Sequence, residues 1–360
     1  MKFINQIEPV YGKEEVKAVT DYMHSGGWLM EFKKTAEFER AIAKYTGANY
    51  CSVVSNGTVS LFIALRTLGV GRGDEVIVPN ITMAATPNAV ILAGAQPVFV
   101  DIEEKSLCID LKKVEVAITG KTKAVMHVSL NGRAGDLVKL KELCDQKGIF
   151  LIEDAAQSLG SFHQGRHLGT FGIMGSFSFS YPKIITTGQG GALITNSHKL
   201  YQKIKKIKDF GRLRGGVDIY EEVGWNFKFT DLQAVFGVAQ LKKIKERVKK
   251  KKSMFQLYRN LLSGVKDIKF IETDLSETTP WTIDILTSRR HDLSVFLEKE
   301  KIKTRTIYPA LNSQLAYKQK GRFPIADKIS QSCLWLPSSL LLTKKQIEYI
   351  CDKIKKFYKK

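Results

Sequence analysis

The sequence predicts an α/β fold, a mainly parallel sheet followed by a smaller α+β domain. Three observations lead to this class. Short apolar segments alternate with helix-like segments of about ten residues in the first half of the chain, the pattern of parallel sheets covered on both faces. One apolar run ends in Glu153 and Asp154, at the strand end where such sheets place their sites. After about residue 240 this alternation gives way to a lysine-rich segment. A chain of 360 residues is long enough for a large domain and a smaller second domain.

Each element of the first half is predicted from its apolar spacing. Apolar residues about three or four apart indicate a helix, and short continuous apolar runs indicate a buried strand. Glycines at 69 and 94 end two of the helices. Helices are predicted at 13–23, 35–45, 58–67, 84–93 and 137–147, and strands at 50–55, 75–79, 97–101, 123–128 and 150–152.

The C-terminal part begins with a lysine-rich segment, 242–252. Leu241, Ile244 and Val248 recur in it at helical spacing, which predicts one buried stripe under a basic outer face. Strands are predicted at Phe270 and over 281–286, and helices at 292–301 and 343–358. We therefore divide the chain into a large N-terminal domain, 1–240, and a small C-terminal domain, 241–360.

The net charge of +20 has two interpretations. A lysine-rich solvated surface is the favoured one, because net charge bears on solubility more than on fold. Attraction to an anionic substrate or to nucleic acid is the alternative. No aromatic platform interleaves the basic run and no nucleic-acid-binding motif accompanies it, so we expect no nucleic-acid partner. A diphosphate-linked substrate would also be attracted by a positive field.

The remaining composition predicts a reduced, cytoplasmic setting. No run of about 18 apolar residues predicts a membrane span, and the N-terminal segment lacks the apolar core of a secretory signal. The five cysteines are scattered, odd in number and without a CxxC pair. We therefore expect neither a disulfide framework nor a metal site.

The most informative segment surrounds Lys183. This lysine follows the hydroxyl-rich strand 176–180 and precedes the glycine-rich turn 186–191. Upstream, the apolar run 150–152 ends in a carboxylate pair. Pyridoxal phosphate (PLP) requires such a set, because a lysine bonds the cofactor, an acid faces its ring nitrogen, and hydroxyls and amides hold its phosphate.

Together these motifs resemble the DegT/StrS family of PLP-dependent nucleotide-sugar aminotransferases, and perosamine synthases in particular. The resemblance runs nearly end to end, and it implies PLP fold type I, the aspartate-aminotransferase-like fold, with a seven-stranded sheet. Beyond the lysine and acid segments, it rests on GGWL at 26–29, SNGT at 55–58, VPNIT at 78–82, GWNFKFTDLQA at 224–234 and WLP at 335–337.

The resemblance assigns the catalytic roles. Lys183 is the residue that bonds the cofactor and, once released, moves a proton during the reaction. Asp154 keeps the pyridine nitrogen protonated. Glu153 competes for that role, but the family pattern places it at Asp154. Gln157 is expected near the phenolic oxygen of the cofactor.

The resemblance also assigns the phosphate site. Gly57 and Thr58 open a helix whose free N–H groups point at an anion, and glycine permits close approach. Ser178, five residues before the reactive lysine, adds a hydroxyl. Asn226 matches a family asparagine that reaches the phosphate from the neighbouring subunit, so the resemblance implies a homodimer with shared sites.

Three positions depart from the family pattern. Met83 stands where relatives usually carry an aromatic residue over the cofactor ring; its thioether can cover a π-face, or the side chain can simply pack in the core. Gln189 replaces a glutamate. Lys228 replaces an arginine, and the two are not equivalent for bidentate contacts. These departures bear on the substrate more than on the reaction.

The resemblance implies that L-glutamate aminates the cofactor, leaving 2-oxoglutarate and pyridoxamine phosphate, and that a nucleotide-linked 4-keto-6-deoxyhexose receives the nitrogen. A 3-keto sugar stays open, as do the nucleotide and the stereochemistry. The products would be amino sugars of the O-antigen or lipopolysaccharide type. A sugar dehydratase of the same fold is disfavoured, because such relatives carry histidine in place of Lys183. A non-enzymatic nucleic-acid-binding regulator is supported by the charge alone.

Overall fold

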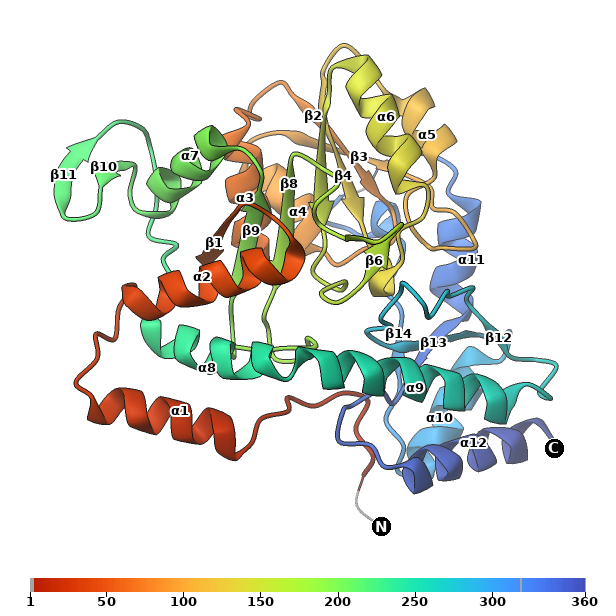
Figure 1. The fold of residues 1–360 in the computed structure, drawn as a ribbon. Helices are drawn as coiled ribbons and strands as arrows, with labels where there is room; N and C mark the ends of the chain where they lie inside the picture. The colour runs from red at the N-terminus through yellow and green to blue at the C-terminus, as the bar shows by residue number, and fades with distance from the viewer. Residues whose placement is uncertain (1–2, 318, 360) are drawn as a thin grey trace.

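The computed structural model describes residues 3–317 and 319–359. A seven-stranded sheet forms the centre of this part of the chain (Figure 1), and β9 alone runs against its neighbours. The mainly parallel sheet expected from the sequence is confirmed. Its strands, in spatial order, are β1 (Tyr50–Val54), β9 (Gly191–Thr195), β8 (Met174–Ser178), β5 (Phe150–Asp154), β4 (Thr122–Val128), β2 (Glu75–Pro79) and β3 (Gln96–Val100).

Helices cover both faces of this sheet, since successive strand residues point to opposite sides. Val76 and Val78 pack on one side in a core that holds α3 (Gly57–Thr67), α4 (Ala85–Leu92) and α7 (His198–Lys208). Ile77 packs on the other side, against α5 (Leu111–Ala117) and α6 (Leu137–Lys147). Farther along that second face, Val53 and Phe177 pack against α2 (Lys33–Thr46) and α8 (Asp231–Lys242).

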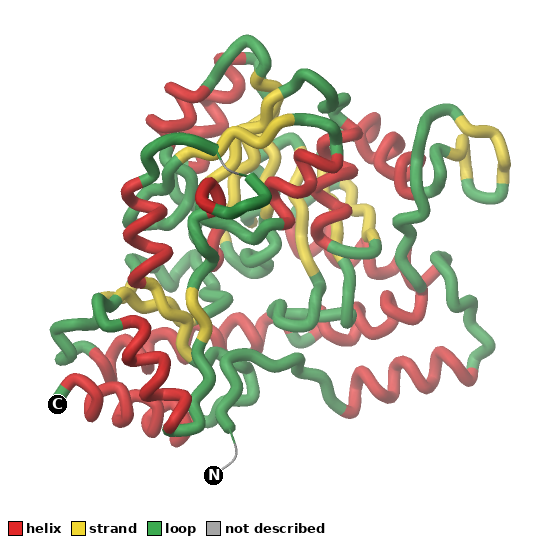
Figure 2. Tube along the Cα trace, turned by 180° about the vertical axis from the view of Figure 1, so that it is seen from behind, coloured by secondary structure: helices red, strands yellow, loops and turns green. Residues whose placement is uncertain are grey.

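The C-terminal part forms a second hydrophobic core. A four-stranded antiparallel sheet, ordered β12-β13-β15-β14, packs with three helices. Ile4 joins this core and pairs with Ile302, so the start of the chain lies with its end (Figure 1, Figure 2). The elements are α9 (Ile244–Leu262), β12 (Lys269–Phe270), β13 (Ile283–Leu286), α10 (Arg290–Lys299), β14 (Arg305–Thr306), β15 (Cys333–Leu336) and α12 (Lys344–Tyr358). The division of the chain at residue 240 stays a proposal, and residues 1, 2, 318 and 360 of its two ranges lie outside the described part.

The lysine-rich segment differs from the single amphipathic helix expected there. The helix breaks at Lys243, between the end of α8 and the start of α9. Arg247 and Lys251 are buried rather than solvated, and both donate hydrogen bonds to backbone carbonyls. The expectation of a uniformly basic outer face is therefore wrong at these two positions.

The smaller elements complete the fold. The hairpin of β10 and β11 projects from the body of the molecule in Figure 1. The five cysteines are buried and free, and no helix of the described residues is both long and apolar enough to cross a membrane. These elements are α1 (Lys13–His24), η1 (Leu130–Gly132), β6 (Phe162–His163), β7 (Arg166–His167), β10 (Arg212–Arg214), β11 (Val217–Tyr220), η2 (Leu311–Ser313) and α11 (Pro324–Ser332).

Candidate active site

A cavity of about 710 Å³ lies where several strands of the large sheet end. Its lining comes from the start of α3, the end of β5, the loop after β8 and three residues of the C-terminal part. Every site residue predicted from the sequence lines this cavity except Asn226. The lining residues that were predicted are Gly57, Thr58, Met83, Asp154, Gln157, Ser178 and Lys183.

Lys183 lies in the loop that joins β8 to β9. Its backbone N–H donates to the carbonyl of Ser180 at 3.1 Å, which closes a turn and aims the side chain at the cavity. Burial lowers the pKa of Lys183 to about 8; the carboxylate of Asp154 opposes this shift, and the charge of Arg305 adds to it. A lysine of lowered pKa offers more neutral amine near pH 7, which suits covalent attachment of a carbonyl cofactor.

The two acids at the end of β5 point to opposite faces of the sheet. Asp154 lines the cavity and accepts a hydrogen bond from the Thr86 hydroxyl at 2.8 Å. Glu153 accepts the N–H groups of Gly169 and Gly172, each at 2.7 Å, on the other face. Burial raises the pKa of both carboxyls, that of Glu153 to about 7. Asp154 is therefore the acid that faces the cavity, and strand alternation is the reason.

The start of α3 forms an anion cradle with β8. Asn56 caps the helix by accepting the N–H of Val59 at 2.9 Å, and the N–H groups of the first turn have no partner within the helix. A β-carbon at Gly57 would lie 3.0 Å from the β-carbon of Ser178, so only glycine fits without displacing it. This close approach places the Ser178 hydroxyl beside the helix terminus, where Thr58 also lines the cavity. Such donors suit a phosphate.

Gln157 and Met83 lie at different depths of the site. Gln157 is buried; its side-chain oxygen accepts the N–H of Asn131 at 2.8 Å, and its nitrogen donates to the Tyr308 hydroxyl at 3.3 Å. Met83 leaves 48% of its surface exposed while lining the cavity. Core packing therefore does not account for Met83 in this chain.

Asn226 lies away from the other predicted residues. It forms an isolated bridge with Asp209, to whose carboxylate Lys228 donates at 2.7 Å. Within one chain the structure does not bring Asn226 into the cavity, and its contribution to a neighbouring subunit stays a prediction. Gln189, in contrast, lines the cavity.

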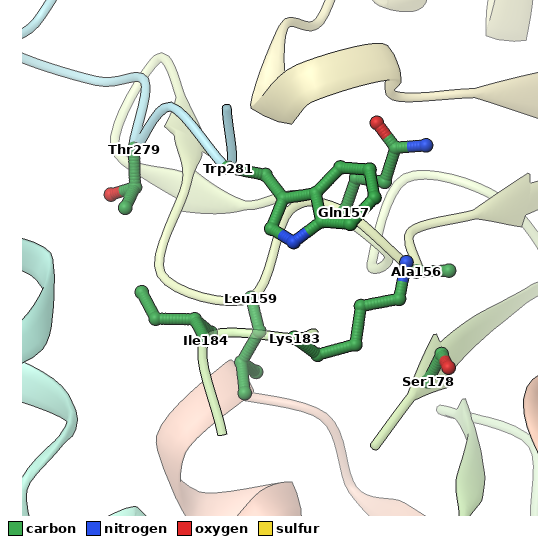
Figure 3. A pocket seen from close by; sticks show the side chains of 8 residues that line it. All are labelled: Ala156, Gln157, Leu159, Ser178, Lys183, Ile184, Thr279 and Trp281. Atoms are coloured by element: carbon green, nitrogen blue, oxygen red, sulfur yellow. The ribbon is translucent and has the colours of Figure 1, made fainter. Parts of the chain in front are cut away.

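Three residues of the C-terminal part complete the lining and were not predicted: Trp281, Arg305 and Tyr308. The Arg305 guanidinium lies 5.7 Å from the ring of Tyr308 and forms no ion pair with any described residue. In Figure 3 the Trp281 ring lies over the Lys183 side chain, which extends toward Ala156. These residues belong to no motif, and an isolated aromatic residue or arginine gives no sequence signal of a site.

The assembled residues fit PLP. The Lys183 amine, a buried carboxylate and a glycine-lined helix terminus with a hydroxyl beside it open onto one cavity. Lys183 would hold the cofactor covalently, Asp154 would face its ring nitrogen, and α3 with Ser178 would hold its phosphate. The bound cofactor supplies an electron sink to the substrate carbon.

Comparison with known proteins identifies the chain. The family model described as the DegT/DnrJ/EryC1/StrS aminotransferase family matches residues 9–355. A GDP-perosamine synthase of Vibrio cholerae is 34% identical over 359 residues, 98% of each chain.

Solved structures are similar over the same length. The aminotransferase TlmJ of Streptoalloteichus hindustanus is 29% identical, with a TM-score of 0.94 over 98% of each chain. A putative sugar aminotransferase of Streptococcus pneumoniae, solved in a PLP form, is 26% identical, with a TM-score of 0.92 over 99% of each chain. These matches confirm the fold type and PLP as the cofactor. The family model and the Vibrio cholerae relative show that the chain belongs to the DegT/DnrJ/EryC1/StrS aminotransferase family.

Proposed function

We propose that this PLP-dependent sugar aminotransferase takes its amino group from L-glutamate and delivers it to C4 of a nucleotide-linked 4-keto-6-deoxyhexose. The observation that carries the proposal is the convergence of Lys183, Asp154 and the start of α3 on one cavity. The substrate follows from the full-length similarity to a GDP-perosamine synthase.

The side chains divide the work by position. The Lys183 amine moves the proton between the substrate carbon and the cofactor carbon, because Lys183 is the one lysine among the described residues that line the cavity. Asp154 holds a proton on the ring nitrogen. The first turn of α3 and the Ser178 hydroxyl hold the phosphate, so the ring cannot drift from the lysine.

The charge of the cavity supports an anionic substrate. Arg305 lines the cavity without an ion-pair partner among the described residues, and the whole chain carries a net charge of +20. A sugar nucleotide presents a diphosphate, which such a field attracts. A sugar dehydratase is the second candidate, but relatives of that activity carry histidine in place of Lys183.

A homodimer is part of the proposal. The segment 28–32 exposes Trp28, Leu29, Met30 and Phe32, each between 47% and 61%. Contiguous exposed apolar side chains of this kind mark protein interfaces. Asn226 lies outside the cavity of its own chain, as expected if it serves the site of a second copy. Light scattering that finds an active monomer would contradict this.

The function is tested by a substrate screen. The purified protein is incubated with glutamate and GDP-, UDP- or dTDP-linked 4-keto-6-deoxy and 3-keto sugars, and the products are identified by mass. We expect a mass change of amination with a 4-keto sugar, and none with the Lys183→Ala variant. A preference for aromatic or aspartate-type keto acids over every sugar nucleotide would overturn the substrate.

A further inference from the structure

The Lys183 amine rests on an aromatic face. Its Nζ atom lies 4.1 Å from the centroid of the Trp281 ring. Among the described residues Nζ has no hydrogen bond and no ion pair. A ring face attracts a cation through its quadrupole, and tryptophan is the strongest of the aromatic residues in this respect. The Trp281 ring is therefore a direct contact of the reactive amine.

Trp281 is itself fixed at two points. Its indole N–H donates to the carbonyl of Pro182 at 2.7 Å, and Pro182 directly precedes the reactive lysine. Its backbone carbonyl accepts a hydrogen bond from the side-chain nitrogen of Lys251 at 2.7 Å. Lys251 is buried and donates as well to the carbonyl of Ser338. A lysine is costly to bury unless carbonyls satisfy it, so this pair of bonds fixes the Trp281 backbone firmly.

The edge of the ring is fixed too. Trp335 lies at 5.5 Å from Trp281 in an edge-to-face arrangement, and both are almost fully buried. The indole therefore has little freedom to turn away from the lysine. The contact between Trp281 and Lys183 joins the segment just before β13 to the loop between β8 and β9.

We propose that the Trp281 ring holds the Lys183 amine, as a cation, in the part of the cycle when that amine is not bonded to the cofactor. The inference rests on the proposed transamination, in which the donor nitrogen takes the place of the lysine nitrogen on the cofactor carbon and leaves the amine free. Trp281 is thus a positioning residue that acts through Lys183. The hydrogen bond from its indole N–H to the carbonyl of Pro182 keeps the ring close to the Lys183 amine.

The charge balance around the amine explains why a ring is needed. Asp154 from β5 favours the ammonium, while burial and Arg305 from β14 disfavour it. Tyr308, the next ionisable residue after Arg305, is neutral at working pH because burial raises its pKa. The Trp281 ring offsets part of the destabilisation of the Lys183 ammonium by burial and by Arg305. It does so without a second carboxylate, which would compete with Asp154 for the ring nitrogen of the cofactor.

The test measures the free amine directly. Wild type, Trp281→Phe and Trp281→Leu are loaded with pyridoxamine phosphate, which leaves Lys183 unbonded without any substrate turnover. The rate at which acetic anhydride modifies Lys183 is followed against pH by peptide mass spectrometry. Thermal melting of each loaded protein confirms that it is folded.

We expect the labelling midpoint of Trp281→Leu to fall by about half to one pH unit, because a lost cation–π contact destabilises the ammonium. Trp281→Phe keeps a weaker face and falls by less. An unchanged or raised midpoint in the leucine variant overturns the inference, even if the enzyme transaminates sugars normally. If the leucine variant does not fold, the phenylalanine variant decides, and its midpoint must lie below that of wild type. Failure of the substrate screen leaves this measurement untouched, so the two proposals fail separately.

Discussion

The two walls of the cavity are built differently. The sheet wall consists of Gly57 at the start of α3, Asp154 and Ser178 at strand ends, and Lys183 in the loop after β8. The C-terminal wall consists of Trp281, Arg305 and Tyr308, which come from the C-terminal part of the chain. Backbone topology positions the first set, whereas Trp281 and Tyr308 are positioned by packing of their side chains into the core on one face of the large sheet.

This difference assigns different work to each wall. In the proposed function the sheet wall supplies the groups that bond the cofactor or move a proton, because strand ends and helix termini fix the geometry of such groups with few degrees of freedom. The C-terminal wall holds a cation and ring faces, with Trp281 against the Lys183 amine and Tyr308 against Arg305, and in the proposed function Arg305 attracts an anionic substrate. Changes in the sheet wall should therefore abolish the reaction, and changes in the C-terminal wall should retune it.

Removal of the reactive amine should have the largest effect. Lys183→Ala is expected to lose at least about 10³-fold in turnover, because both the covalent attachment and the proton transfer depend on this nitrogen. Its visible absorption band should be absent. Turnover with glutamate and a keto sugar, together with an absorption spectrum, measures this. Lys199→Ala, on an exposed position of α7, is the matched control. Wild-type turnover in Lys183→Ala would remove the assignment.

The second effect separates the two acids of β5. Asp154→Asn should keep PLP but slow the reaction by roughly 10²–10³-fold, since the ring nitrogen loses a charged partner. Glu153→Gln makes the same change one residue away, on the other face of the sheet. It should lower stability and leave turnover per folded molecule within a few-fold. Equal losses in both variants would show that burial, and not contact with the ring, makes Asp154 important.

The sheet wall was predictable because its signals are local. Asp154 ends an apolar run, and Gly57 opens a segment of helical spacing, so each residue's place follows from its own neighbours. Glu153 could not be excluded from the sequence with equal ease, because the register of one strand decides which acid faces the site. Asn226 lies outside the cavity of its own chain, and its service to a second copy stays a prediction.

The C-terminal wall was not predictable for the opposite reason. Trp281 was expected only as the start of a strand, and its place over Lys183 results from carbonyls and rings brought together across the fold. Lys251 shows the same limit. The apolar spacing of the basic run predicts that its lysines are solvated. Lys251 is nevertheless buried, and it donates hydrogen bonds to the carbonyls of Trp281 and Ser338.

A smaller effect tests the C-terminal wall. Arg305→Met should raise the Michaelis constant for the sugar nucleotide about tenfold, because a charged contact to the diphosphate is lost. The turnover number should change less. In wild type the Michaelis constant should rise with salt as charge attraction is screened, and this rise should be weaker in the variant. Lys303→Met removes the same charge two residues away, outside the cavity lining. If the Michaelis constant and its dependence on salt changed equally in the two variants, Arg305 would act only through the net charge of the protein.

The smallest effect concerns the stability of the C-terminal wall. Burial lowers the pKa of Lys251 to about 7 from an ordinary 10.5. Between these values the unfolded chain binds more protons than the folded one, so this residue makes the free energy of unfolding rise with pH, by at most about 1.4 kcal/mol per pH unit. Chemical denaturation of the PLP-loaded wild type and of Lys251→Met, from pH 6.5 to 9.5, measures the difference. It should move in favour of the wild type as pH rises, because the methionine has no proton to lose. Parallel curves would mean that Lys251 stays charged in its site, where the carbonyls of Trp281 and Ser338 accept its hydrogen bonds.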